Sequence, residues 1–144
     1  MSKIHLLKLN FKDTDFSIIR DIRKNVFTAE LGISESNLFD DEDEKCDHFI
    51  LFDGKQPIGS IRVLLVENNV KLERMAILSE FRARNYGRCA IFQIIEYYQT
   101  KQYHKIILDS IYQVRNFYKK CGFVEEGAIF QRVGMDHIRM SLTL

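Results

Sequence analysis

Apolar and polar positions recur along the chain with two periodicities, one typical of strands and one typical of helices. Residues 3–9 (KIHLLKL) predict a first strand, and residues 14–30 place isoleucine, valine and phenylalanine at helical spacing. Strand-like runs follow at residues 46–52, 57–66 and 70–78. The pairs Asp53-Gly54 and Asn68-Asn69 predict tight turns between these runs.

The second half of the chain repeats the alternation. The stretch 81–92 leads into a predicted helix with one apolar face, made of Ala90, Ile91, Ile94, Ile95 and Tyr98. A strand at 105–110, a helix at 112–122 ending at Gly122, and strands at 123–130 and 137–144 complete the pattern. The order β-α-β-β-β-α-β-α-β-β predicts a mixed sheet with helices on its faces. Composition shows no break, so we expect a single domain over residues 1–144.

The composition of the chain argues against several classes of protein. The net charge is +1, so a nucleic-acid partner is not expected. No apolar run reaches the roughly 18 residues of a membrane span, and the polar residues among the first ten do not fit a signal peptide. Cys46, Cys89 and Cys121 match no zinc spacing, so we expect no metal and a reduced, cytoplasmic protein.

An acidic segment, residues 34–47 (SESNLFDDEDEKCD), separates the first predicted helix from the second predicted strand. We expect a mobile, solvated loop. An alternative is that its carboxylates attract a cationic ligand; they are Asp40, Asp41, Glu42, Asp43 and Glu44.

The stretch 81–92 (FRARNYGRCAIF) places three arginines where a strand gives way to a helix. Free N–H groups and the helix dipole at such a junction form an anion site, which Arg82, Arg84 and Arg88 would strengthen. Gly87 would let a phosphate approach the backbone, and Asn85 tolerates a left-handed conformation. A pyrophosphate is the expected ligand, and a merely solvated helix start is the alternative.

Residues 74–95 (RMAILSEFRARNYGRCAIFQII) resemble the acetyl-CoA signature of the GNAT superfamily of N-acetyltransferases. Its Arg/Gln-x-x-Gly-x-Gly/Ala core corresponds to Arg82-x-x-Asn85-x-Gly87, with asparagine in place of the first glycine. A second family block is similar to residues 116–123 (NFYKKCGF), and residues 22–33 and 134–140 resemble the ElaA-like branch. The resemblance implies an α/β (α+β) GNAT fold, with a central mixed, mostly antiparallel sheet flanked by about four helices.

The same resemblance implies an N-acetyltransferase that moves the acetyl group of acetyl-CoA to an amine of a small molecule, by direct attack in a ternary complex. The pantetheine arm would lie along the edge formed by Met75, Ala76 and Ile77. The pyrophosphate would rest on the loop from Arg82 to Arg88, and Asn116 is a further cofactor contact. The residues of that loop are Arg82, Ala83, Arg84, Asn85, Tyr86, Gly87 and Arg88.

The chemistry needs a base for the amine and an acid for the leaving thiolate. Tyr118 matches the family tyrosine beside the coenzyme sulfur and is the expected acid. His137 is the expected base because an ordinary pKa near 6.5 suits proton abstraction at physiological pH. Glu73 is the main rival for that role and Glu30 a third, with Glu30 also expected beside the substrate.

Arg23 and Arg74 are the expected substrate contacts, and would favour a carboxylate or phosphate on the acceptor. The alternative is that both only pack or face solvent. For the whole chain, a GNAT-fold domain that senses acyl-CoA without turnover is the alternative to an enzyme, and acetylation of protein tails is a further one. The strand at 137–144 would form a homodimer if it lies at a sheet edge.

Overall fold

A computed structural model describes residues 4–144, in which seven strands form one sheet in the order β1-β2-β3-β4-β5-β7-β6. The strands are β1 (Ile4–Leu9), β2 (Asp47–Asp53), β3 (Gln56–Val66), β4 (Asn69–Ile77), β5 (Lys105–Ile111), β6 (Val124–Arg132) and β7 (Met135–Thr143). All neighbours pair antiparallel except β4 and β5, which are parallel. The predicted order of elements and the mixed, mostly antiparallel sheet are confirmed. The predicted start of the first strand, Lys3, lies outside the described residues.

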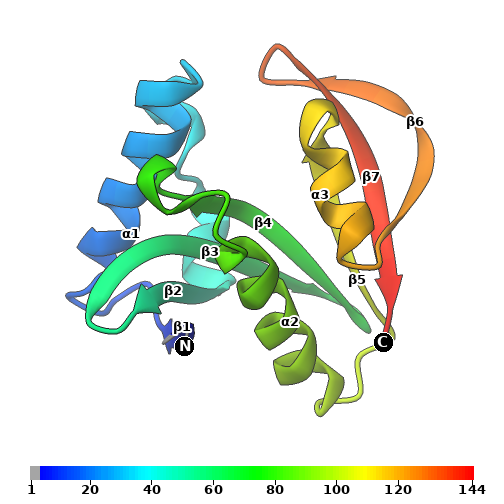
Figure 1. Cartoon of the computed structure of the whole chain (residues 1–144), viewed down its shortest axis with the longest axis horizontal. Helices are drawn as coiled ribbons and strands as arrows, with labels where there is room; N and C mark the ends of the chain where they lie inside the picture. Colours follow the sequence, from blue (N-terminus) through cyan, green and yellow to red (C-terminus); the bar gives the residue numbers. More distant parts are fainter. Residues whose placement is uncertain (1–3) are drawn as a thin grey trace.

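Two helices cover opposite faces of the sheet, as Figure 1 shows. Helix α1 (Phe16–Arg23) packs on one face, where Ile50 of β2 belongs to its cluster. Helix α2 (Tyr86–Gln99) packs on the other face, where Phe49 and Leu51 of β2 are buried with it. Successive side chains of a strand point to opposite faces, so an unbroken apolar run such as 49–51 suits a strand covered on both sides.

The helix predicted over residues 14–30 changes its winding partway. An α-helix ends at Arg23 and a π-helical segment, Lys24–Glu30, continues it. Gly32, with φ +72°, terminates the segment, and its N–H donates to Thr28 O at 3.0 Å. Wide turns of this kind are frequent at functional sites. Here the segment carries Phe27 and Glu30 into the cavity described below.

The parallel pair β4 and β5 is joined over only part of its length. The strands pair from Asn69–Lys105 to Leu72–Leu108 and then separate, while β4 remains paired with β3 as far as Ile77. Figure 1 shows β4 and β5 starting side by side and then diverging. The separation leaves the backbone of Glu73 to Ile77 without a strand on that side, in the region where the cofactor arm is expected.

A bulge in β4 lies at the point of separation. Arg62 pairs with Glu73 and Ser60 with Ala76, so two residues of β4, Arg74 and Met75, face one residue of β3. Arg74 has φ +48°, a left-handed conformation that is costly for an arginine. A bulge re-aims the side chains around it and increases the local twist of the strand.

The C-terminal half differs from the prediction in one respect. Strand β7 lies between β5 and β6, so residues 137–144 are not an edge and the dimer pairing predicted for them is wrong. Strand β7 pairs with β5 on one side and with β6 on the other, so β6 is the edge strand at this end of the sheet. The helix expected at 112–122 forms a short turn, Tyr112–Val114, and then α3 (Arg115–Lys120). Within residues 4–144, no helix has the length and apolar character needed to cross a bilayer.

Candidate active site

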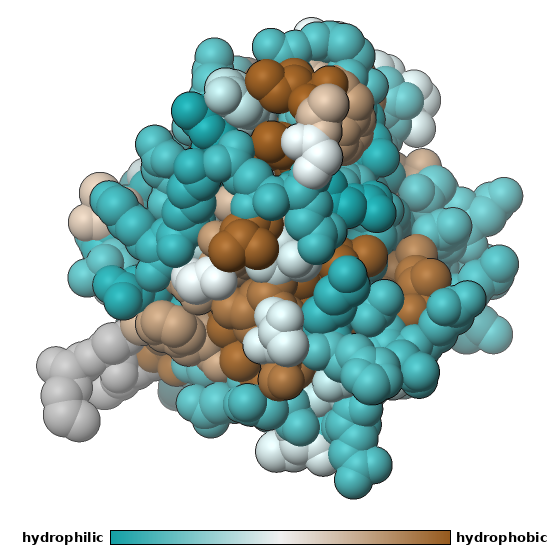
Figure 2. Space-filling view, turned by 90° about the vertical axis from the view of Figure 1, so that its right-hand side faces the viewer, coloured by the Kyte–Doolittle hydropathy of each residue, from teal (hydrophilic) through white to brown (hydrophobic). Residues whose placement is uncertain are grey.

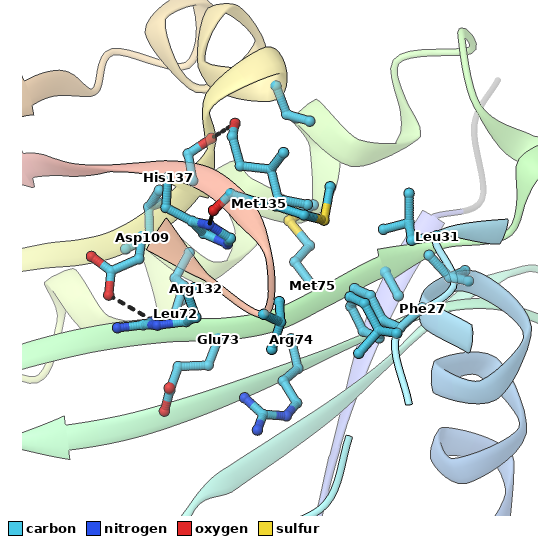
Figure 3. A pocket seen from close by; sticks show the side chains of 18 of the residues that line it. Phe27, Leu31, Leu72, Glu73, Arg74, Met75, Asp109, Arg132, Met135 and His137 are labelled. Atoms are coloured by element: carbon cyan, nitrogen blue, oxygen red, sulfur yellow. Dashed lines mark hydrogen bonds and ion pairs between the residues drawn. The ribbon is translucent and has the colours of Figure 1, made fainter. Parts of the chain in front are cut away.

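A cavity of about 480 Å³ opens where β4 and β5 separate. Its walls come from β4, β5, the π-helical segment, α3 and the hairpin of β6 and β7. Figure 3 shows side chains from these elements converging on it, with Met75 and Met135 near its centre and Phe27 and Leu31 on one wall. Residues from across the whole chain therefore meet in one place.

The loop between β4 and α2 has the backbone of an anion site. Ala83 and Asn85 both have left-handed φ angles, +61° and +62°. The conformation expected of Asn85 is confirmed, and Ala83 shares it unexpectedly. The N–H of Cys89 donates to Asn85 O at 3.0 Å, so the N–H groups of Tyr86, Gly87 and Arg88 precede the first bond of the helix. Curled backbone of this kind ahead of a helix forms a concave array of donors for an anion.

The three arginines of this loop do not play equal parts. Arg84 and Arg88 are exposed, and their guanidinium groups lie only over the rings of Phe81 and Phe92. Arg82 is tied down, because it donates two bonds to the Glu30 carboxylate, at 2.9 and 2.7 Å, and one to Ile77 O at 2.9 Å. Arg84 and Arg88 are therefore free to reach phosphates, whereas Arg82 joins the loop to the π-helical segment.

Gly87 also has a packing role that the sequence did not predict. A Cβ atom there would lie 3.0 Å from the ring of Phe117 and 3.3 Å from the side chain of Ile77. The missing side chain thus lets α2 approach α3 and β4, and the approach of a phosphate to this glycine stays a prediction. The backbone N–H of Gly87 remains part of the donor array.

Tyr118 of α3 lies beside the β4 edge. It lines the cavity, and its hydroxyl donates to the sulfur of Met75 at 3.7 Å. Burial raises the pKa of this hydroxyl well above its usual value of about 10. The group therefore keeps its proton at neutral pH, as a general acid must. Asn116, two residues earlier, is exposed and does not line the cavity.

His137 of β7 also lines the cavity and is only 6% exposed. Its Nδ1 lies 2.9 Å from Met135 O. A carbonyl can only accept, so this bond assigns the hydrogen of the neutral ring to Nδ1 and leaves a lone pair on Nε2. The ring of Phe130 packs 5.8 Å away and limits its rotation. The arrangement gives an oriented nitrogen that can accept a proton.

Glu73 lines the same cavity but is held by two cations. Its carboxylate lies 3.2 Å from a guanidinium nitrogen of Arg62 and 3.8 Å from Lys71 Nζ. Arg62 is 1% exposed. The carboxylate is positioned firmly, on the face of β4 that Lys71 shares.

Arg23 is not in the cavity, which contradicts its predicted contact with the substrate. It is 0% exposed and its Nη1 donates to both carboxylate oxygens of Asp43, at 3.1 and 3.2 Å, and to Leu38 O. Burial lowers the pKa of Arg23 to about 10, although Asp43 favours its charged form. Arg74 does line the cavity, but its guanidinium group is bound to Leu38 O, Asn37 O and Asp40.

The acidic segment is correspondingly not the solvated loop that its composition predicted. Asp43 is 1% exposed and also binds Arg62 at 3.2 Å, while Asp40 binds Arg62 at 2.6 Å and Arg74 at 3.1 Å. His48 Nε2 lies 2.7 Å from Asp43 O. The segment is thus bound to the sheet through Asp40 and Asp43, which neutralise arginines, while Asp41, Glu42 and Glu44 are exposed. Through Asn37 and Leu38 it forms part of the cavity wall.

Sequence reasoning missed Asp109 and the apolar side chains that line the cavity. Asp109 follows the last residue of β5 that pairs with β4, and it binds Arg139 at 2.8 Å, Arg132 at 3.0 Å and Lys71 at 3.7 Å. Burial alone would raise the pKa of Asp109, but its hydrogen bonds to Arg139 and the nearby positive charges hold it below its usual value. An acidic residue inside a predicted buried strand was the available signal. Leu31, Val133 and Met135 gave no signal because each resembles an ordinary apolar residue.

Comparisons with known proteins agree with this geometry. A model of the acetyltransferase (GNAT) domain matches residues 31–144. The uncharacterized protein YyaT of Bacillus subtilis is 31% identical over 123 residues, which cover 83% of each chain. A solved structure from Lactobacillus plantarum shares the fold with a TM-score of 0.87 at 19% identity over 98% of each chain. Escherichia coli ElaA does so with a TM-score of 0.81 at 18% identity, covering 96% of this chain and 98% of its own.

A structural neighbour that contains a ligand has the same architecture. The spermidine N-acetyltransferase of Vibrio cholerae, in complex with CoA and spermine, has a TM-score of 0.70 at 20% identity over 96% of this chain and 95% of its own. These likenesses show the fold, and the domain match covers most of the chain. The resemblance read from the motifs is confirmed: the chain belongs to the GNAT family of N-acetyltransferases.

Proposed function

We propose that this protein transfers an acetyl group from acetyl-CoA to an amine of a small molecule by direct attack in a ternary complex. The observation that carries the proposal is the convergence of Tyr118, His137 and the unpaired edge of β4 on one cavity. An oriented proton acceptor, a protonated hydroxyl and a free strand edge are the three parts that the reaction requires.

The residues present fit the cofactor that the family uses. The free backbone of Met75 to Ile77 suits an extended amide-containing arm, because such an arm pairs with a strand edge as another strand would. The donor array of residues 83–88, with exposed Arg84 and Arg88, suits a pyrophosphate. Asn116 remains a proposed outer contact. Acetyl-CoA, when bound, supplies the acetyl group as a thioester.

Two side chains of the protein, His137 and Tyr118, would carry out the proton transfers. His137 Nε2 would take the proton of the attacking ammonium group, since an amine of pKa near 10 is mostly protonated at neutral pH. The neutral amine nitrogen would form the new C–N bond as the C–S bond breaks, and the Tyr118 hydroxyl would give its proton to the departing sulfur. The excess proton left on the amide nitrogen would then pass to the Tyr118 phenolate, directly or through water, and restore the acid. Glu73 is the second candidate for the base, held by Arg62 and Lys71.

Cofactor binding is tested first and separately from turnover. A ligand at about 100 times its dissociation constant adds about 2.7 kcal/mol to the free energy of unfolding, which thermal unfolding with acetyl-CoA would detect. Charge reversal by Arg84→Glu with Arg88→Glu should abolish most of that shift. Lys101→Glu, which reverses an exposed charge just beyond the other end of α2, is the matched control and should not.

Turnover is then measured as acetylated product and free thiol in single-residue variants. We expect His137→Ala and Tyr118→Phe each to lower kcat about 10²-fold or more with the acetyl-CoA shift intact. A larger loss in Glu73→Gln than in His137→Ala would transfer the role of base to Glu73. A full binding shift with no product from any amine would reject the enzyme and favour the acyl-CoA sensor.

A further inference from the structure

The structure assigns a class of acceptor to this cavity, an inference that rests on the proposed function. We infer that the acceptor is an amine carried on an apolar body, and that Leu31 and Val133 contact this body from two sides of the cavity mouth. The prediction excludes polyamines and amino acids as preferred acceptors. Three features of the cavity support it: the state of its charges, the position of its exposed apolar residues and the backbone of Val133.

The first observation is that the charges of the cavity are already paired. Seven charged residues line it, and each takes part in an ion pair with another residue; they are Glu30, Lys71, Glu73, Arg74, Arg82, Asp109 and Arg132. The spermidine N-acetyltransferase named above acts on a polycation, which needs carboxylates that can face it. Here each lining carboxylate has one to three cations within 4 Å. A charged acceptor body would have to displace them.

The second observation concerns apolar side chains that remain exposed. Leu31 (42%), Val114 (42%) and Val133 (46%) are among the most exposed large apolar residues of the described chain, and all three line this cavity. They come from three separate segments of the chain, so their meeting is a property of the fold. Exposed apolar residues gathered around one opening, above a wall containing Phe27 and Met135, mark a site that buries an apolar ligand.

Figure 2 views the molecule from the side of β6. Brown, apolar atoms lie near the top of that face and also over its middle and lower parts, between hydrophilic side chains. Figure 1 places the turn of the β6–β7 hairpin at the height of the upper group. Exposed apolar residues of this hairpin are Val124, Ile129 and Val133, and of these three only Val133 lines the cavity.

The third observation is the strained backbone of Val133. Arg132 and Met135 pair as the last and first residues of β6 and β7, so Val133 and Gly134 form a two-residue turn with φ angles of +46° and +75°. Such a turn strongly prefers Asn-Gly, and a β-branched residue with positive φ is a clear outlier. The protein therefore keeps a valine at a cavity-lining position where asparagine would be more stable. Strain that persists in this way marks a functional position.

The two roles of Val133 can be separated by Val133→Asn, which relieves the turn and removes the apolar side chain. We expect its midpoint of thermal unfolding to rise by about 3 °C or more. Its kcat/KM for an apolar amine should fall about tenfold, as expected for a lost contact in an apolar pocket. Ile129→Asn is the matched control, because Ile129 is 48% exposed on the same hairpin but does not line the cavity.

The acceptor class itself is tested with purified wild-type protein, acetyl-CoA and four amines. Phenethylamine and hexylamine represent apolar bodies, spermidine represents a polycation and lysine represents a carboxylate-bearing amine. We expect kcat/KM for the apolar amines to exceed that for the other two by about 100-fold, and only the apolar amines to be affected by Val133→Asn.

The possible results distinguish the inferred acceptor class from the proposed acetyltransferase activity. Preferred turnover of spermidine or lysine would overturn the apolar acceptor and leave the acetyltransferase intact. A stabilised Val133→Asn with unchanged kcat/KM for apolar amines would also overturn it, because the turn would then be free of any role in binding. Absence of product from all four amines, with acetyl-CoA bound, would reject the proposed function and this inference with it.

Discussion

The buried carboxylate of Asp43 should be the most sensitive single charge in the protein. It accepts two bonds from Arg23 and one from Arg62, at 3.1 to 3.2 Å, and the three side chains are 0 to 1% exposed. Asp43→Asn keeps the shape of the side chain and removes its charge. Arg62 would then keep its ion pairs with Asp40 and Glu73, whereas Arg23 would lose its ion pair with Asp43.

The size of the effect follows from leaving a buried charge uncompensated, which costs about 3–5 kcal/mol. A chain of 144 residues unfolds with an entropy of about 0.3 kcal/mol/K, from about 2.1 cal/mol/K per residue. We therefore expect the thermal midpoint to fall by about 10–17 °C. Since total stabilities are about 5–15 kcal/mol, this loss would remove a large share of the stability of the protein.

Urea unfolding followed by circular dichroism measures this loss. The matched control is Asp41→Asn, the same chemical change at an exposed residue of the same turn, expected to stay within about 0.5 kcal/mol of wild type. Adding Arg23→Met should recover about 1 kcal/mol or more, because the uncompensated charge is then gone. A loss below about 1 kcal/mol in Asp43→Asn, or no recovery in the double variant, would refute the reasoning.

Three further outcomes are expected. Gly87→Ala should cost about 1–3 kcal/mol in urea unfolding, because its Cβ would meet Phe117 at 3.0 Å; equal stability would contradict the packing. The pKa of His48 is lowered, mainly by burial. The stability that the neutral His48 contributes is therefore complete above the unfolded pKa of about 6.5 and is lost as the pH falls toward the folded pKa. His48→Gln should consequently lose less stability than wild type between about pH 7 and pH 5. Because the pKa of Tyr118 is raised, wild-type kcat should show no loss from tyrosine ionisation up to about pH 10, and an alkaline fall centred below pH 9 that Tyr118→Phe abolishes would disprove this.

Local sequence determined much of this protein. The spacing of apolar residues specified nearly every helix and strand, because amphipathic periods of two and 3.6 residues report directly which face of an element is buried. The conformation of the cofactor loop was also readable, since Asn85 is one of the few residue types that accept a left-handed backbone. Tyr118 and His137 were found through their surrounding motifs, and both line the cavity.

Tertiary structure alone decided which charges are free. Arg23 was expected to contact the substrate and Asp43 to lie in a solvated loop, yet the two are buried against each other and neither lines the cavity. Residues 137–144 looked like an edge because strand order depends on long-range pairing, which no local period encodes. The cavity has the same origin, since it opens where the pairing of β4 and β5 ends and its walls come from segments far apart in the sequence. A residue's type sets what chemistry it can do, and the contacts that it gains on folding decide whether that chemistry remains available.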